Sequence, residues 1–196
     1  MGVVRLHDEY VVLLDEGGTP AGRQLKATVH HEHTPLHLAF SIFLFDGAGQ
    51  ALFQQRAESK LAWPGVWSNA CCGHPSPGEP LVDAAHRRLR EELGIETHIP
   101  LELVLPEFRY RARWADIWEN ELCPVFVGHY DGPVRPNPRE VAAVQWIAWS
   151  DFAGAVIGDG AMSLEAFSPW SRWEAALLLG HRTALAHRGD LTSQRG

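Results

Sequence analysis

A chain of 196 residues with 45% hydrophobic and 21% charged side chains is long enough for one domain with a sizeable core. A formal net charge of −7 argues against non-specific binding to nucleic acid, and no apolar run approaches the length of a membrane span. The charged residues between Met1 and Pro20 argue against a secretory signal, and three cysteines, with Cys71 and Cys72 adjacent, do not suit a disulfide framework. We therefore expect a cytoplasmic protein, and we favour a monomer over an oligomer.

The first half of the chain predicts short apolar strands joined by turns. Tyr10 to Leu14 is apolar and is followed by turn-forming residues as far as Pro20. His37 to Phe45 is aromatic and continuous, which predicts one buried strand. A turn at Asp46 to Gly49 then leads to a return strand near Leu52 to Gln55.

The middle of the chain predicts a loop and a helix. Asn69 to Cys72 reads as a strand end, and Gly73 to Gly78 as a loop. Pro80 to Leu93 has the pattern of a helix, and Gly94 is placed to end it in the left-handed conformation.

The second half predicts four more strands and a final helix. Ser168 caps this helix, which begins at Pro169 and runs over about residues 169–188, with Trp170, Trp173, Leu177 and Leu178 on one face. Strands dominate, so the sequence predicts one mixed α/β domain. The four strands are predicted at Leu101–Leu105, Glu107–Arg113, Trp118–Tyr130 and Val141–Trp149.

Residues 73–95 contain a spaced set of glycines, glutamates and arginines that resembles the Nudix box. The helix places Arg88 four residues before Glu92, so one face can offer a carboxylate to a hard cation and a guanidinium to a phosphate. Taken alone, such pairs also fit a solvated helix with ordinary ion pairs, but Gly73 and Glu79 at their fixed offsets favour the box. Arg88 stands where Nudix hydrolases have glutamate, which suggests that phosphate is gripped and not hydrolysed.

Stretches around the box resemble type 1 isopentenyl-diphosphate isomerases over roughly Val11 to Trp170. The resemblance implies a Nudix-like α+β fold, a mixed β-sheet sandwiched between α-helices, in a single isomerase domain over 1–196. It also implies metal-dependent interconversion of isopentenyl and dimethylallyl diphosphate, for isoprenoid biosynthesis, through a tertiary cation. The stretches are His37–Ser41, Trp63–Trp67, Asn69–Pro75, Phe108–Ala112, Glu119–Phe126 and Phe167–Trp170.

A metal site is the first implication of the resemblance. Glu119 and Glu121 are two apart on a predicted strand, so both carboxylates point to one side. Mixed nitrogen and oxygen ligation by five donors suits Mn²⁺ or Mg²⁺, while Zn²⁺ usually takes fewer ligands. His31 and His33 could compete with His30 for the first position. The implied ligands are three histidines and two carboxylates, namely His30, His37, His74, Glu119 and Glu121.

The resemblance places an acid–base pair at Cys72 and Glu121, on opposite faces of the substrate, with Tyr110 helping to hold the proton of Glu121. A thiol near cationic groups and a metal ionises more readily, so we expect some thiolate character at Cys72. Trp170 would stabilise the cationic intermediate by up to about 2 kcal/mol. The alternative is that Cys72 is a small buried hydrophobe and Tyr110 a half-buried strand residue.

The diphosphate would be bound by four cationic side chains that include both lysines of the chain. Glu92 and the backbone carbonyl of Cys72 match the position of a Mg²⁺ that bridges the diphosphate oxygens. The four implied phosphate-binding residues are Lys26, Arg56, Lys60 and Arg88.

Three functions compete. The resemblance favours an isomerase that acts on a small-molecule diphosphate, without nucleic acid, membrane or nicotinamide. The box alone favours a Nudix hydrolase of a nucleoside diphosphate derivative, which Arg88 and the run Cys72-Gly73-His74-Pro75 oppose. A degenerate Nudix-like binding module fits poorly with a complete catalytic set.

Overall fold

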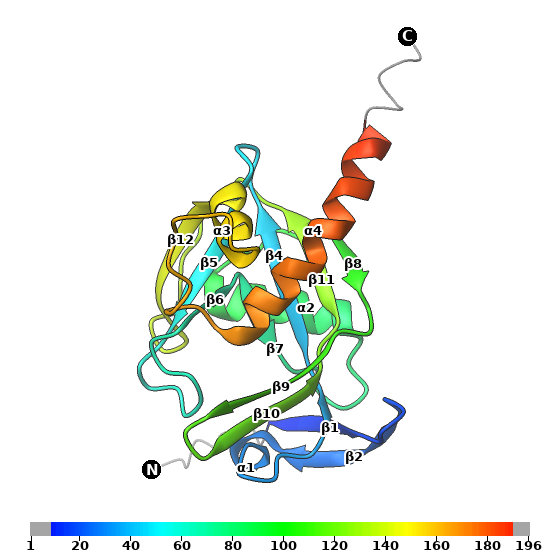
Figure 1. The fold of residues 1–196 in the computed structure, drawn as a ribbon. Coiled ribbons are helices and arrows are strands. Elements are labelled where there is room, and N and C mark those ends of the chain that lie inside the picture. Colours follow the sequence, from blue (N-terminus) through cyan, green and yellow to red (C-terminus); the bar gives the residue numbers. More distant parts are fainter. Residues whose placement is uncertain (1–8, 190–196) are drawn as a thin grey trace, which may run out of the picture.

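The computed structural model describes residues 9–189, with side chains as far as His181, so the ends of the predicted domain lie outside the described residues. The described chain forms two β-sheets and four helices (Figure 1). The larger sheet has seven strands. Its order is β12 (Val141–Ala148), β5 (Gln50–Arg56), β4 (Phe40–Phe45), β11 (Val125–His129) and β8 (Leu101–Leu105), with β6 (Trp67–Asn69) beside β5 and β7 (Cys71–Gly73) beside β4.

The smaller sheet lies at the lower end of the molecule in Figure 1 and has five strands. The short helix α1 (Lys26–Val29) follows one of its edge strands. The strand order is β2 (Pro20–Leu25), β1 (Tyr10–Leu14), β3 (His37–Leu38), β10 (Ile117–Leu122) and β9 (Arg109–Trp114).

Helices cover both faces of the larger sheet (Figure 1). On β4 the side chains of Phe40, Ile42 and Leu44 pack with α2 (Leu81–Leu93), because alternate residues of a strand face opposite sides. Phe43 and Phe45 point the other way and pack with α3 (Trp149–Val156) and α4 (Pro169–Gly189). The predicted architecture, a mixed sheet between helices, is therefore confirmed.

Two segments that the sequence predicts as single strands each pass from one sheet to the other. His37–Phe45 breaks at Ala39 into β3 and β4, and Trp118–Tyr130 breaks at Cys123 and Pro124 into β10 and β11. The two breaks lie side by side, since the Ala39 amide donates to the Leu122 carbonyl at 2.9 Å. Both predictions of continuity were wrong. The parallel pairing that results sets Glu121 opposite His37.

Several predicted boundaries are close to the observed ones. β1 and β8 match, and α2 ends at Gly94, whose φ of 63° is left-handed as expected. A Cβ at Gly94 would also lie 2.8 Å from the Arg135 carbonyl oxygen, so both the backbone conformation and the lack of space favour glycine here. The sequence analysis missed β2, α1 and α3, and it assigned Trp149 to a strand although this residue begins α3.

Helix α4 buries a different face from the predicted one. It begins at Pro169, and the Ser168 hydroxyl accepts from the Ser171 amide at 3.4 Å, as a capping serine does. However, Trp173 is 43% exposed and Leu177 51% exposed. Trp170 and Leu178 are buried as predicted, but Ser171, Glu174 and Ala175 complete the buried face in place of Trp173 and Leu177.

Candidate active site

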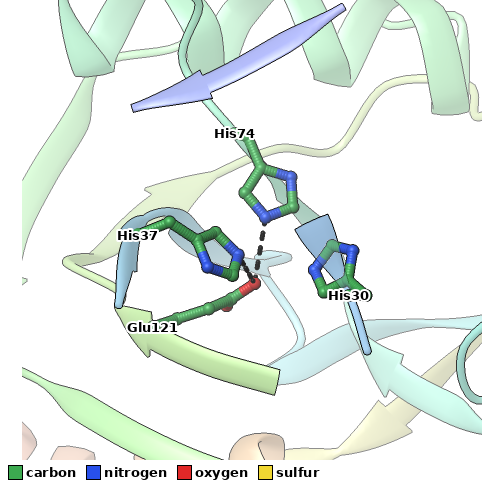
Figure 2. Close-up of side chains that lie close together, drawn as sticks. All are labelled: His30, His37, His74 and Glu121. Atoms are coloured by element: carbon green, nitrogen blue, oxygen red, sulfur yellow. Dashed lines mark hydrogen bonds and ion pairs between the residues drawn. The ribbon is translucent and has the colours of Figure 1, made fainter. Parts of the chain in front are cut away.

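Three histidines and a glutamate converge from different elements of the fold (Figure 2). His30 ends α1, His37 begins β3, His74 follows β7, and Glu121 lies on β10. Glu121 Oε1 lies 3.0 Å from His74 Nε2 and 3.4 Å from His37 Nε2. One possible ligand atom from each of the four residues lies within 4.8 Å of the others. The cluster is therefore compact enough to hold one metal ion.

Glu119 lies beside this cluster but is not one of the four residues whose ligand atoms lie within 4.8 Å of one another. It is buried on the same side of β10 as Glu121, as the spacing predicts. Its Oε2 lies 2.9 Å from His30 Nε2, yet neither atom has a hydrogen bond of ordinary geometry, and His37 Nε2 has none either. Buried polar atoms are normally satisfied, so this group of close but unbonded donor atoms fits a bound cation.

Electrostatics keep His74 and Glu121 in the forms that bind a cation, which are a neutral imidazole and an ionised carboxylate. Burial lowers the pKa of His74 to about 3, which leaves its ring neutral. Burial opposes ionisation of Glu121, but hydrogen bonds from His37 and His74 outweigh it and hold the pKa of this carboxyl well below its usual range. For His37, burial is outweighed by the bond with Glu121, so its pKa is raised, and its ring would have to release its proton on binding a metal.

The other oxygen of Glu121 is held by Tyr110. The phenolic hydroxyl donates to Glu121 Oε2 at 2.7 Å, on the paired strands β9 and β10. Burial, with the negative charge of Glu121 adding to it, raises the pKa of Tyr110 well above its usual value, so the hydroxyl keeps its proton. Glu121 thus faces the histidines with one oxygen and a proton donor with the other.

Cys72 is a protonated thiol. Its sulfur donates to Asn69 Oδ1 at 3.2 Å and lies 3.3 Å from Ser41 Oγ. Burial, followed by the negative charges of Glu174 and Glu121, raises the pKa of Cys72 to about 12. The charged protein groups that act on this sulfur are acidic and not cationic, so by themselves they oppose the expected thiolate character. The other two cysteines are buried.

Trp170 lies between the surroundings of Cys72 and those of Glu121. Its indole N–H donates at 3.0 Å to Ser68 Oγ, which lies 3.9 Å from Cys72 Sγ. On the other side its ring stacks on Tyr110, with centroids 5.7 Å apart. Trp63, in a left-handed conformation with φ 54°, meets Trp170 edge to face at 5.3 Å. The rings of Trp170, Tyr110 and Trp63 thus form an aromatic wall beside Cys72 and Glu121.

Lys60 and Arg88 converge on one carboxylate. Both donate to Glu140 Oε2, Arg88 at 3.1 Å. Arg88 also binds Glu91 at 3.0 Å and Glu92. Glycine at position 73 permits this approach, because a Cβ there would lie 2.9 Å from Arg88 Cγ. The structure therefore brings two of the four predicted phosphate-binding residues together.

The other two predicted phosphate-binding residues have different partners. Lys26 pairs with Glu9 at 2.7 Å, and the pKa of Glu9 is lowered first by Lys26 and further by the charges of Arg88 and Arg87. Lys26 thus stands near the same positive region. Arg56 instead donates to the carbonyls of Ala62 and Trp63 at 3.0–3.2 Å, and so holds the loop before β6.

Glu92 and the carbonyl of Cys72 both contact the Cys71 thiol. Cys71 Sγ is 3.5 Å from Glu92 Oε2 and 4.0 Å from the Cys72 carbonyl oxygen. Glu92 also accepts from Gln54 at 3.0 Å. The two groups predicted to hold Mg²⁺ therefore share one neighbour, the Cys71 side chain.

Comparison with known proteins identifies the family of the chain. The family model of the NUDIX domain matches residues 35–170. An isopentenyl-diphosphate Delta-isomerase of Mycolicibacterium vanbaalenii is 51% identical over 89% of this chain and 96% of its own. One of Saccharopolyspora erythraea is 50% identical over 87% of this chain and 86% of its own. The chain belongs to this isomerase family, within the NUDIX domain proteins.

Solved structures of NUDIX-type proteins have a fold similar to that of this chain. DR0079 from Deinococcus radiodurans has a TM-score of 0.59 at 20% identity and covers 81% of this chain and 95% of its own. A MutT protein from Methanosarcina mazei Go1 has a TM-score of 0.60 at 17% identity, over 76% of this chain and 96% of its own. Among the described helices, none is both long and apolar enough to cross a membrane.

Three residues near the sites were missed by the sequence analysis. Ser41 contacts Cys72, Glu140 joins Lys60 to Arg88, and Glu174 is a fully buried carboxyl group. No local signal marked the burial of Glu174, because glutamate is almost never fully buried without a partner.

Proposed function

We propose that the protein interconverts isopentenyl diphosphate and dimethylallyl diphosphate through a tertiary carbocation, as the names of its relatives indicate. The observation that carries the proposal is the position of Trp170. This ring contacts Ser68, next to the Cys72 thiol, and Tyr110, which binds the Glu121 carboxylate. An alkene beside that ring would lie near both a proton donor and a proton acceptor.

The raised pKa of Cys72 and the lowered pKa of Glu121 support one assignment of the two roles. Cys72, a thiol whose pKa is raised, donates its proton to C4 of isopentenyl diphosphate, and the positive charge develops at C3. Glu121, a carboxylate whose pKa is lowered, accepts a proton from C2 with Tyr110 holding its second oxygen. The faces of Trp170 and Tyr110 stabilise the cation and exclude water that would otherwise trap it.

We propose two sites for divalent ions. His30, His37 and His74, with the carboxylates of Glu119 and Glu121, would hold Mn²⁺, Mg²⁺ or Zn²⁺. Glu92 and the Cys72 carbonyl would hold a Mg²⁺, whose positive charge would offset the negative charge of the diphosphate. These ions supply positive charge, the first beside the acid–base pair and the second beside the phosphates.

The diphosphate would lie over the positive region formed by Lys26, Lys60 and Arg88. Arg56 acts there by holding the neighbouring loop. Hydrolysis of a nucleoside diphosphate derivative is less well supported, because the box position of Arg88 carries a guanidinium bound to three glutamates and not a carboxylate. The free cysteines agree with a reducing cytoplasm.

The test is incubation with isopentenyl diphosphate in deuterated water, with NMR of the product. We expect deuterium in the methyl and vinyl positions, and no phosphate released from nucleoside diphosphate compounds. Cys72→Ala should lower turnover by about a thousandfold, the loss of a general acid. Cys123→Ala removes another buried thiol and should stay active. An active Cys72→Ala enzyme, or rapid phosphate release, would overturn the proposal.

A further inference from the structure

Asn69 is a buried amide beside the Cys72 thiol to which the proposed reaction gives no role. It ends β6 and is 0% exposed. Its Nδ2 lies 3.0 Å from the carbonyl oxygen of Ile42 on β4 and 3.3 Å from that of Cys71 on β7. Backbone carbonyls only accept hydrogen bonds, so the amide nitrogen faces them and the amide oxygen faces the other way. The backbone of two neighbouring strands thus fixes the orientation of this side chain.

Two donors converge on the amide oxygen of Asn69. Ser68 Oγ lies 2.9 Å from Asn69 Oδ1, and Cys72 Sγ lies 3.2 Å from it. An amide oxygen has two lone pairs and no proton, so the hydroxyl and the thiol both donate to it. The proton of Cys72 therefore points at Asn69 before substrate binds.

Ser68 connects the same oxygen to Trp170. The indole N–H, which can only donate, gives its proton to Ser68 Oγ at 3.0 Å, and the Ser168 hydroxyl donates to the same atom at 3.3 Å. Ser68 accepts both bonds and passes its own proton to Asn69. The hydrogen bonds run in one direction from Trp170 through Ser68 to Asn69, where they meet the bond from Cys72.

We propose that Asn69 is a positioning residue that holds the Cys72 thiol and the Trp170 ring in one fixed arrangement, so that both meet the same alkene. The proposal rests on the proposed roles of Cys72 and Trp170. In the reaction the S–H group turns from Asn69 toward C4, which is easy because a thiol is a weak donor. The S–H bond then breaks with its electron pair on sulfur, while the alkene π electrons form the new C–H bond. Glu121 takes up one proton from C2, so the proton count balances.

The kinetic test removes the two hydrogen-bonding groups one at a time. Asn69→Leu replaces the amide by an apolar group of similar size, and kcat should fall by about a hundredfold because the thiol and the ring lose their alignment. KM should stay unchanged, since the diphosphate is bound elsewhere. Ser68→Ala breaks only the connection to Trp170, and kcat should fall by roughly fivefold. Ser68→Thr keeps the hydroxyl and should restore most of kcat.

Ser171→Ala is the matched control. Ser171 is equally buried, but its hydroxyl contacts Ser168 at 2.6 Å and neither Asn69 nor Trp170, so kcat should stay at the original level. If Ser68 acts through Asn69, Ser68→Ala should cost nothing further when position 69 is already leucine. Independent, multiplying losses would contradict the proposal. A Ser68→Ala enzyme with the original kcat would overturn it even if Asn69→Leu did not fold.

Infrared spectroscopy of the S–H stretch separates positioning from a general effect on folding. Cys72→Ala identifies the band of this thiol, and Asn69→Leu should shift that band because the S–H group loses its acceptor. An unshifted band in folded Asn69→Leu would overturn the proposal. If Cys72→Ala is active, the proposed function fails; if it is inactive while Asn69→Leu keeps the original kcat, only the role of Asn69 fails.

Discussion

The histidine–carboxylate cluster and the Arg88 cluster differ in how their charges are satisfied. In the first, His30 and Glu119 bring donor atoms within 2.9 Å without a hydrogen bond between them. In the second, the terminal nitrogens of Arg88 bind three glutamates. The first cluster is incomplete until a cation joins it, whereas the second already carries counter-charges, which a diphosphate and its metal would have to rearrange.

The largest effect should come from the histidine cluster. His37→Ala removes a buried ring that faces Glu121, so the cation affinity of the cluster should collapse. We expect loss of one bound metal ion per chain, measured by elemental analysis after dialysis. Isomerase activity should fall by roughly a hundredfold to a thousandfold, as for the loss of electrostatic stabilisation in an active site.

His33→Ala is the matched control for this change. His33 is exposed, and its backbone amide donates to the neighbouring His31 ring. Metal content and activity should stay at the original level, which would exclude His33 as the competing ligand. A His37→Ala protein that kept its metal would show that the close nitrogen and oxygen atoms have another cause.

The Arg88 cluster should respond in stability more than in metal content. Arg88→Leu leaves Glu92 buried without its cation, and breaking a buried pair in this way costs about 3–5 kcal/mol of unfolding free energy. Urea unfolding measures this loss, and KM for isopentenyl diphosphate should rise. The exposed Arg90→Leu should change neither quantity. A parallel loss of metal from the histidine cluster would mean that the two regions are not independent.

The aromatic wall lies beside Cys72 and Glu121 and should show an intermediate effect. Trp170→Phe keeps an aromatic face but loses the bond to Ser68, whereas Trp170→Ala loses both. A cation–π contribution of about 2 kcal/mol corresponds to about 30-fold in kcat between the two variants. Steady-state kinetics at matched metal content measures this ratio. Equal losses would show that the ring face does not stabilise the cation.

The two regions also differ in how far the sequence could predict them. The box helix is local: its spacing predicted α2, its end at Gly94 and the neighbours Arg88 and Glu92. The histidine cluster depends on register, because Glu121 meets His37 only where β3 and β10 pair in parallel. Apolar strands carry no local signal for the break at Ala39, although Pro124, which cannot donate to a ladder, marks the matching break.

The role of α4 shows why periodicity alone misplaced a side chain. Trp170, Trp173 and Leu177 form an apolar stripe that predicted the buried face, yet the last two are exposed. Glu174 faces inward instead, although glutamate is almost never fully buried without a partner. The tertiary packing of α4 causes this burial, which raises the pKa of Glu174.

The smallest effect belongs to an ion pair beside the Arg88 cluster. Arg87 grips Glu79 with two bonds of 2.8 Å, and this contact lowers the pKa of Glu79 below 4.5. Because the folded pKa is depressed, the pair stabilises the fold above the unfolded pKa and ceases to do so as pH falls through the folded value. Glu79→Gln should therefore cost about 1 kcal/mol of unfolding free energy at pH 7. That difference should vanish in acid, where the original Glu79 is protonated as well.

Urea unfolding at decreasing pH measures the difference in unfolding free energy between Glu79→Gln and the original protein, with the exposed Glu96→Gln as control. A difference that stayed constant with pH would mean that the carboxylate charge of Glu79 does not contribute to stability. The Arg88 cluster would then be held by the ion pairs of Arg88 alone.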